Sequence, residues 1–239
     1  MAELIKLYEG RAVLSYDNDP RASLTAYNRI IQLDPDNIEA HQNSGLILQR
    51  LGEIKEAEKA LKKSLSLAKK TGTKFKIAGC YLSLGWFEQN LRKFENAKSL
   101  HLKALDIFTE LQNKQGIAGC YYNLGIVEQN LRKFENAKKL YQKALDISIE
   151  LQNKQGIASC YQNLGIVEQN LGKFEDAKSL HLKALDIFTE LQNKFGIANC
   201  YMSLGAVEQN LGEFEKARTL YQNSLSISIE LQNKQGIAD

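Results

Sequence analysis

The side chains with the clearest capacity for chemistry are four cysteines at a fixed interval. Cys80, Cys120, Cys160 and Cys200 stand 40 residues apart, each within the pattern IA-x-C-Y. Such a column invites a metal or a disulfide interpretation. Neighbouring packed helices lie about 8–10 Å apart, however, whereas a disulfide requires Cα atoms within about 7 Å and zinc requires sulfurs about 2.3 Å away. We therefore predict four buried free thiols that pack as small apolar side chains.

The rest of the sequence offers little support for catalysis. It contains no G-x-x-x-x-G-K-[ST], H-E-x-x-H, G-x-S-x-G or C-x-x-C motif. Of its three histidines, His41, His101 and His181, the last two stand where Tyr141 and Tyr221 stand in alternate repeats. We interpret these two as interhelix packing residues rather than bases or ligands. The expectation is a protein without enzymatic activity, metal or cofactor.

Composition narrows the class of partner. The chain has 239 residues, 44% of them apolar and 25% charged, with a net charge of +3. So small a charge does not indicate nucleic acid or an anionic membrane as a partner. No apolar run approaches the length of a membrane span, and the start MAELIKLYEGRAVL lacks the features of a secretion signal. We expect a cytoplasmic protein.

The cysteine interval belongs to a repeat that covers most of the chain. Residues 116–155 and 156–195 are identical at 30 of 40 positions. A longer rhythm lies above this one, because SLHLKALDIFTELQNK occurs at 99–114 and 179–194, and ISIELQNKQGIA occurs at 147–158 and 227–238. The array is thus an 80-residue pair, duplicated. A fixed period of 20 to 50 residues usually indicates a solenoid.

Each 40-residue unit predicts two helices. In the unit 116–155, helix A is expected at about 116–130 and helix B at about 134–152. The turn between them reads LRKF, LGKF or LGEF, and Gly172 and Gly212 suit the left-handed conformation that often ends a helix. The segment LQNK closes helix B, and Asn153 can serve as its C′ residue or as the N-cap of the next helix.

These patterns resemble the tetratricopeptide repeat (TPR). The string Y-x-N-L-G-x-x-x-x-x-L-G-x-F-x-x-A-x-x-x-(Y/H)-x-x-A-L is similar to its helix–turn–helix consensus, in which Gly125, Ala137 and Ala144 would let paired helices approach closely. The 40-residue period and the NLG box are similar to the extended repeats of kinesin light chains, Leu-Gly-Asn-type G-protein modulators and bacterial Rap-type regulators. The resemblance implies an all-α, right-handed solenoid of about six repeats.

We expect a single array over 1–239. Its repeats are predicted at 1–35, 36–75, 76–115, 116–155, 156–195 and 196–235, with a one-residue insertion near Asp17–Pro20 in the first. Residues 236–239 would begin a further, truncated helix. The family usually has an aromatic residue three positions after the glycine, where this chain has Glu88, Glu128, Glu168 and Glu208. A buried carboxylate is costly unless paired, so we expect each glutamate to reach a lysine, an amide or water at a repeat junction.

The resemblance also implies that one face of helix A lines the concave groove of the solenoid. That face would have an apolar floor that includes Trp86, Tyr122, Ile126, Ile166 and Met202, bordered by amides. The residues predicted to bind a partner are Asn43, Leu82, Trp86, Gln89, Asn90, Tyr122, Asn123, Ile126, Gln129, Asn130, Gln162, Asn163, Ile166, Gln169, Asn170, Met202, Gln209 and Asn210.

This composition suits a peptide. Amides offer both a donor and an acceptor, as a peptide main chain does. In the extended-repeat relatives the asparagine before Leu-Gly holds a ligand's main chain, which implies this role for Asn43, Asn123 and Asn163, with Ser83 and Ser203 as shorter substitutes. The alternative is that these amides stay solvated or cap local backbone.

The sequence does not favour a carboxylate clamp for chaperone tails. A carboxylate clamp for chaperone tails needs basic residues early in helix A, where the chain has Glu39, Gly79, Gly119, Ser159 and Asn199. We therefore expect a non-catalytic scaffold that binds an extended or helical segment of a partner protein. The alternatives are a structural solenoid that associates end to end through an uncapped C-terminal repeat, and a sensor domain excised from a longer signalling protein.

Overall fold

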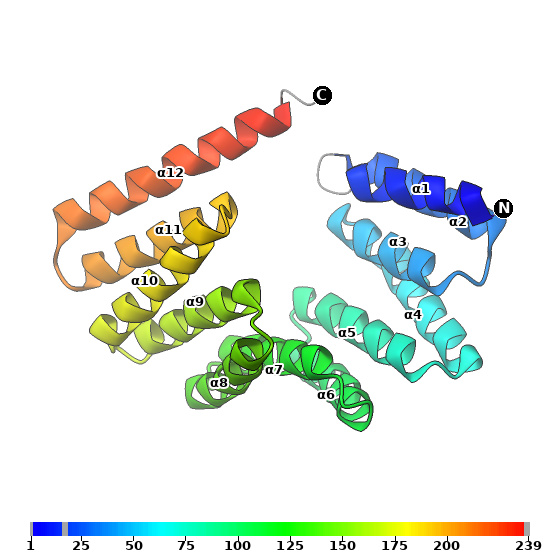
Figure 1. The fold of residues 1–239 in the computed structure, drawn as a ribbon, viewed down its shortest axis with the longest axis horizontal. Helices are drawn as coiled ribbons and strands as arrows, with labels where there is room; N and C mark the ends of the chain where they lie inside the picture. The colour runs from blue at the N-terminus through cyan, green and yellow to red at the C-terminus, as the bar shows by residue number, and fades with distance from the viewer. Residues whose placement is uncertain (1, 16–18, 237–239) are drawn as a thin grey trace. The chain divides into compact units, whose positions relative to one another are not determined.

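The computed structural model describes residues 2–15 and 19–236, which form twelve α-helices and no strand. The predicted all-α fold of about six helix–turn–helix repeats is confirmed, and Figure 1 shows the successive antiparallel pairs. The helices are α1 (Ala2–Ser15), α2 (Pro20–Leu33), α3 (Ile38–Arg50), α4 (Ile54–Thr71), α5 (Lys74–Asn90), α6 (Phe94–Glu110), α7 (Lys114–Asn130), α8 (Phe134–Glu150), α9 (Lys154–Asn170), α10 (Phe174–Glu190), α11 (Lys194–Asn210) and α12 (Phe214–Gly236).

The chain divides into two compact units, Met1–Asn113 and Lys114–Asp239. Within each unit, every helix packs on the helix before it and on the helix after it. The odd-numbered helices correspond to the predicted helix A and the even-numbered helices to helix B. The single array over 1–239 stays a prediction, and the expected insertion near Asp17–Pro20 falls largely on residues 16–18, outside the described part of the chain.

Local sequence explains where the helices begin and end. The Asn153 side chain accepts a hydrogen bond from the Gly156 amide at 3.0 Å and so caps α9. In the A–B turns, Gly172 and Gly212 have positive φ values of 76° and 83°, as predicted. Arg132 adopts the same conformation without a glycine, at 58°.

The helix B ending predicted at LQNK is confirmed for α6, α8 and α10 but is wrong for α12. Those three helices end at a turn that the following asparagine stabilises through its backbone amide. At the corresponding place α12 continues without a break to Gly236. Asn233, which corresponds to the turn residue Asn153, therefore lies inside α12. Residues 237–239 of the predicted further helix lie outside the described residues.

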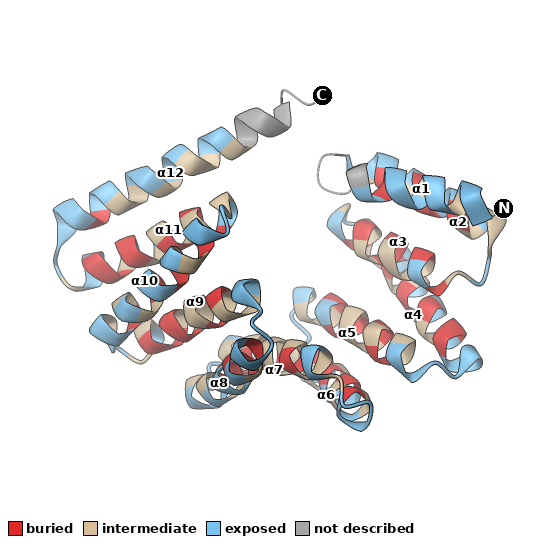
Figure 2. Ribbon diagram, viewed as in Figure 1, coloured by how far each residue is buried: buried red, intermediate tan, exposed pale blue. Residues whose placement is uncertain are grey.

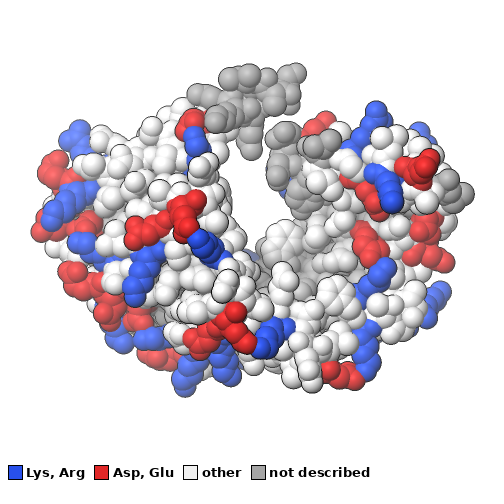
Figure 3. All heavy atoms as spheres, viewed as in Figure 1, with Lys and Arg blue, Asp and Glu red and all other residues white. Residues whose placement is uncertain are grey.

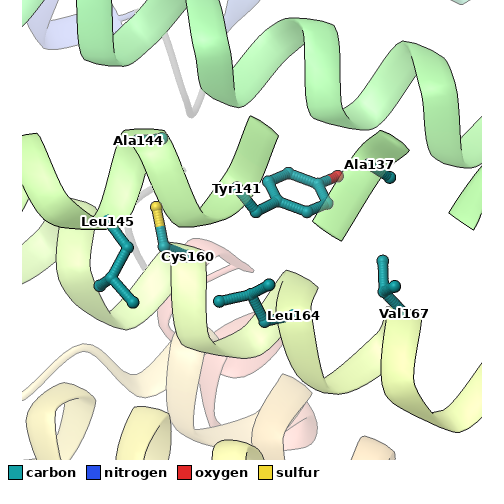
Figure 4. Close-up of a cluster of buried hydrophobic side chains, with 7 residues drawn as sticks. All are labelled: Ala137, Tyr141, Ala144, Leu145, Cys160, Leu164 and Val167. Carbon is teal, nitrogen blue, oxygen red and sulfur yellow. The ribbon is translucent and has the colours of Figure 1, made fainter. Parts of the chain in front are cut away.

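The core is a series of clusters between adjacent helices (Figure 2). In one of them, α8 contributes Tyr141, Ala144 and Leu145, and α9 contributes Cys160 and Leu164 (Figure 4). The Tyr141 ring lies so close to Gly125 that a Cβ there would be 2.6 Å from the ring. Glycine at this position therefore lets α7 and α8 come together, as the resemblance implied.

All four glutamates of the column have a polar partner, but only Glu168 and Glu208 are shown paired across a repeat junction, as predicted. Glu88 meets Lys93 and Asn96 of its own repeat. Glu168 of α9 meets Lys138 of α8 at 2.5 Å, and Glu208 of α11 meets Lys178 of α10 at 2.7 Å. Asn136 donates to the Glu128 carboxylate at 3.4 Å. The adjacent glutamates raise the pKa of Lys138 and of Lys178. Each of these lysines ties one repeat to the next.

Candidate binding site

Two predicted floor residues are open to solvent. Trp86 on α5 is 41% exposed and Met202 on α11 is 52% exposed, although both are large apolar side chains. Tyr122 and Ile126 are half-buried and pack against the cluster around Tyr141 and Leu164. Ile166 on α9 is half-buried as well. The residues predicted for the floor therefore include exposed side chains and side chains that also support the core.

The predicted amides differ in how far the fold itself occupies them. Asn130 and Asn170 each donate to a carbonyl four residues earlier in their own helix, at 2.8 Å. Gln129 accepts from the Tyr141 hydroxyl at 2.9 Å. Asn163 donates to the Tyr122 hydroxyl at 2.8 Å and to the Ser159 carbonyl at 3.0 Å. Asn130, Asn170 and, through Ser159, Asn163 make the local backbone bonds that the alternative interpretation described. Gln129 and Asn163 are also bound by tyrosines of other helices.

Other members of the set follow the same division. Asn210 donates to the Ala206 carbonyl, Gln209 accepts from the Tyr221 hydroxyl, and Asn43 donates to the Tyr27 hydroxyl at 3.1 Å. Gln89 is half-buried, and its side-chain oxygen has no hydrogen-bond partner among the described residues. The other four predicted residues differ in exposure: Leu82, Gln162 and Gln169 are half-buried, and Asn90 is exposed.

Asn123 is the member of the asparagine ladder that the fold leaves open. Unlike Asn43 and Asn163, it has no side-chain hydrogen bond to any described residue. It is half-buried on α7, next to Tyr122. An amide so placed can still offer its donor and its acceptor to a ligand.

A pocket of about 340 Å³ opens beside Asn123, between α7, α8 and α9. Its floor is formed by small side chains, among them Ala118, Ala144 and Cys160. Amides from α7, α9 and the turn before α9 surround it, and no charged residue lines it. The polar residues of the lining are Gln115, Tyr122, Asn123, Ser148, Asn153, Gln155 and Ser159.

Tyr122 connects this pocket to the core. Its ring meets the Tyr141 ring edge-on, with centroids 5.7 Å apart, while its hydroxyl accepts from Asn163. Burial is the largest cause of the raised pKa of Tyr122, so the hydroxyl stays neutral and serves as a fixed hydrogen-bonding group. One wall of the pocket is thereby held in place.

The cysteines and two of the histidines are in the core, as predicted. All four thiols are free and buried, and burial raises the pKa of Cys120, Cys160 and Cys200 to about 12. His101 and His181 are fully buried between helices, and burial lowers their pKa to about 4.

The described residues contain neither a metal-binding cluster nor a membrane span. No cluster of three or more His, Cys, Asp or Glu side chains suited to a metal ion was found there. In the same part of the chain, no helix is both long and apolar enough to cross a membrane.

Charge is spread rather than concentrated. In the view of Figure 3, Lys and Arg are interspersed with Asp and Glu over the outer helices of each unit, and much of the remaining surface is uncharged. Exposed pairs such as Lys114–Glu150 and Lys154–Glu190 join the start of helix A to the end of helix B in the same repeat. Such pairs add little stability individually.

Comparison with known families settles the classification. Three family models, each described as tetratricopeptide repeat, match residues 38–71, 116–190 and 197–231. The chain is a tetratricopeptide-repeat protein. No curated protein matches its sequence at a significant level.

Solved structures share the TPR fold. BtubC (BKLC) from P. vanneervenii is 22% identical, with a TM-score of 0.72, over 94% of this chain and 92% of that one. A Rap protein complexed with Competence and Sporulation Factor is 17% identical, with a TM-score of 0.81, over 97% of this chain and 65% of that one. TPR-like repeats of a kinesin light chain candidate from Podosopora anserina are 15% identical, with a TM-score of 0.65, over 83% of this chain and 98% of that one.

Sequence reasoning missed most of the pocket in this TPR protein. Tyr122 and Asn123 were predicted as site residues, but Ser148, Gly156 and Gln115 were not. A signal for them was present: residue 148 is serine where the repeats before and after carry phenylalanine, at 108 and 188.

Proposed function

We propose that this TPR protein is a protein–protein interaction scaffold whose A helices bind an extended or helical segment of a partner. The observation that carries the proposal is the uncharged pocket between α7, α8 and α9, which includes Tyr122 and the unoccupied amide of Asn123. A concave site with an apolar floor and a few convergent polar groups is the usual form of a ligand site.

Two further observations support this function. Trp86 and Met202 are large apolar side chains exposed on A helices, where a partner can reach them. A Rap protein with the same fold was crystallised in complex with Competence and Sporulation Factor. Since Asn123 can offer both a donor and an acceptor, a peptide main chain is the ligand that suits it best.

The test is affinity capture from the source lysate with three forms of the full chain. We expect the wild type to retain a partner that the double variant Trp86→Ala, Asn123→Ala loses. Lys139→Glu is the matched control, because Lys139 is exposed on helix B and, unlike Lys138, does not tie repeats together. A partner retained by the double variant and lost with Lys139→Glu would place the site on helix B and overturn the proposal.

A further inference from the structure

The pocket between α7, α8 and α9 has a counterpart 40 residues further along the chain. At the junction of α9, α10 and α11, Ala158, Ala184, Phe188 and Cys200 form a buried cluster. The Phe188 ring lies directly over Gly196, where a Cβ would be 2.5 Å from the ring. This second junction is filled by an aromatic side chain of the protein itself.

The residues that surround Phe188 recur around the pocket. The positions 40 residues before Ala158, Ala184, Gly196 and Cys200 are Ala118, Ala144, Gly156 and Cys160, and all four line the pocket. The position that corresponds to Phe188 is Ser148, which also lines it. The pocket is therefore the Phe188 site with the ring removed.

Exposure agrees with this comparison. Ala118 is 9% exposed, whereas Ala158, beneath the Phe188 ring, is fully buried. The Ser148 hydroxyl does not need a ligand, because it donates to the Ala144 carbonyl at 2.8 Å. An apolar cavity of about 150 Å³ can hold benzene, so a pocket of about 340 Å³ has room for an aromatic side chain.

A small residue at this position does not by itself open a pocket. At the junction of α3, α4 and α5, Ala68 takes the place of Phe188. There Ile38 stands where the pocket has Ala118, and it packs with Leu67, Ala68 and Cys80 in a buried cluster. The junction of α7, α8 and α9 combines Ser148 with Ala118 and Gly156, so nothing in it replaces the ring.

We propose that this pocket, the Ser148 pocket, anchors one neutral aromatic side chain of a partner segment, in the place that the Phe188 ring occupies one repeat later. The inference rests on the proposed function and names the residue type that the site selects. The absence of charge from the lining favours a phenylalanine or tyrosine ring over an acidic or phosphorylated side chain. The amides of Gln115 and Asn123 line the same pocket and can bind the main chain that carries the ring. The Gln155 oxygen already accepts from Asn193 at 3.1 Å, which leaves its amide N–H groups for a ligand.

The first experiment needs no natural partner. The full chain is titrated with three probes while protein NMR shifts are followed. The probes are N-acetylphenylalaninamide (aromatic), N-acetylalaninamide (small) and the α-amide of N-acetylaspartic acid with its side-chain carboxylate free (acidic). We expect saturable shifts of Ser148-pocket residues with the phenylalanine probe alone. The variant Ser148→Phe should weaken that binding at least tenfold, since it rebuilds the arrangement around Phe188 and so is compatible with the fold. Ser228→Phe, the same change at the equivalent position of α12, should leave the affinity unaltered.

The outcomes separate this inference from the proposed function. Equal binding of the alanine and phenylalanine probes, or undiminished binding to a folded Ser148→Phe variant, would overturn the aromatic anchor. Ser148→Phe is added to the capture experiment, where loss of the partner in it and in the double variant Trp86→Ala, Asn123→Ala supports both statements. A partner lost in the double variant but kept in Ser148→Phe leaves the scaffold function standing and overturns the anchor.

Discussion

His101 and His181 each press their ring against a glycine of the preceding helix, at the place where Tyr141 stands in the intervening repeat. The tyrosine hydroxyl reaches Gln129, but both ring nitrogens of each histidine are buried without a partner among the described residues. The Gln89 side-chain oxygen, which corresponds to that of Gln129, is unpartnered too. The histidines thus fill space at a cost in unsatisfied hydrogen bonds.

This arrangement predicts an acid-sensitive fold. Burial lowers the pKa of His101 and His181 to about 4, below the ordinary value of 6.5, so the unfolded chain binds these protons first. Stability is then complete above about pH 6.5 and is lost as the pH falls towards 4, by on the order of 3 kcal/mol per histidine. Urea unfolding midpoints between pH 4 and pH 8 measure this loss.

The variant His101→Tyr tests the same prediction by removing one of the two titrating groups. The variant should no longer lose the stability that protonation of His101 costs at low pH. It should also gain a hydrogen bond to Gln89, which raises the free energy of unfolding by about 1 kcal/mol at pH 7. A variant with the same pH dependence as the wild type would show that His101 is not the group that titrates. His41, which is only half-buried, is the control position.

The four thiols lead to a second prediction at this scale. With a pKa of about 12, Cys120, Cys160 and Cys200 carry roughly one thiolate in 10⁴ at pH 8, and the thiolate is the reactive form. Alkylation of the native protein should therefore be slow, and unfolding in urea should expose all four thiols. Fast native labelling of Cys120 would mean that the A helices are rotated from the described orientation.

Residue types were more predictable than their hydrogen bonds. Burial of the cysteines and of two histidines followed from a period that places them on the packed face of each helix. The hydrogen bonds between Asn163 and Tyr122 and between Gln129 and Tyr141 could not be predicted in this way. They depend on which side chain a neighbouring helix presents. The sequence of a single repeat therefore does not show which amides already hydrogen-bond within the protein.

At the scale of the helix pair, glycine sets how closely helix A and helix B approach. In α5, a Cβ on Gly85 would be 2.5 Å from the His101 ring, whereas a Cβ on Gly79 would meet nothing within 4 Å. We expect Gly85→Ala to destabilise the protein by about 1–3 kcal/mol through overpacking. Gly79→Ala should stabilise it by about 0.5–1 kcal/mol, because alanine favours the helix. Two equal shifts in thermal midpoint would contradict close packing at Gly85.

The lysine–glutamate pairs join one helix pair to the next, which gives a matched test. Lys138→Met leaves the buried Glu168 with Lys173 at 3.8 Å as its nearest lysine, so we expect a loss of about 1–3 kcal/mol. Lys139→Met removes an exposed charge and should change stability by under about 0.5 kcal/mol. Urea unfolding of the two variants at neutral pH makes the comparison, and equal losses would refute a junction role for Lys138.

Helix boundaries in the inner repeats could be predicted to within about two residues, because turn residues and the apolar period agree there. The end of α12 could not, since the LQNK segment that ends α6, α8 and α10 lies inside α12. The Ser148 pocket was missed for a related reason. A serine among apolar residues looks neutral in sequence, and its effect depends on Ala118 and Gly156 being small as well.

At the scale of the whole chain, the 80-residue duplication alternates two kinds of helix B. The helices α6 and α10 combine a histidine with a phenylalanine, at 101 and 108 and at 181 and 188, whereas α8 and α12 combine a tyrosine with a serine. Tyr141 and Tyr221 donate to Gln129 and Gln209, and Ser148 lines a pocket whereas Phe188 fills the next junction. One duplicated pair thereby yields both a closed junction and an open one.

The helix α12 exposes apolar side chains whose counterparts in α8 are covered. Leu145 of α8 is 4% exposed beneath α9, whereas the equivalent Leu225 of α12 is 60% exposed, and Figure 2 shows few buried positions along α12. Phe214 is exposed on the same helix. Since no described helix covers these apolar side chains, we expect the chain to self-associate weakly through them. Sedimentation velocity should show a mass that rises with concentration, and Leu225→Glu should abolish the rise. Leu182→Glu, at an exposed leucine of α10, should leave it unchanged. A wild type that stays monomeric at its highest soluble concentration, or equal effects of the two variants, would rule out α12 as the contact.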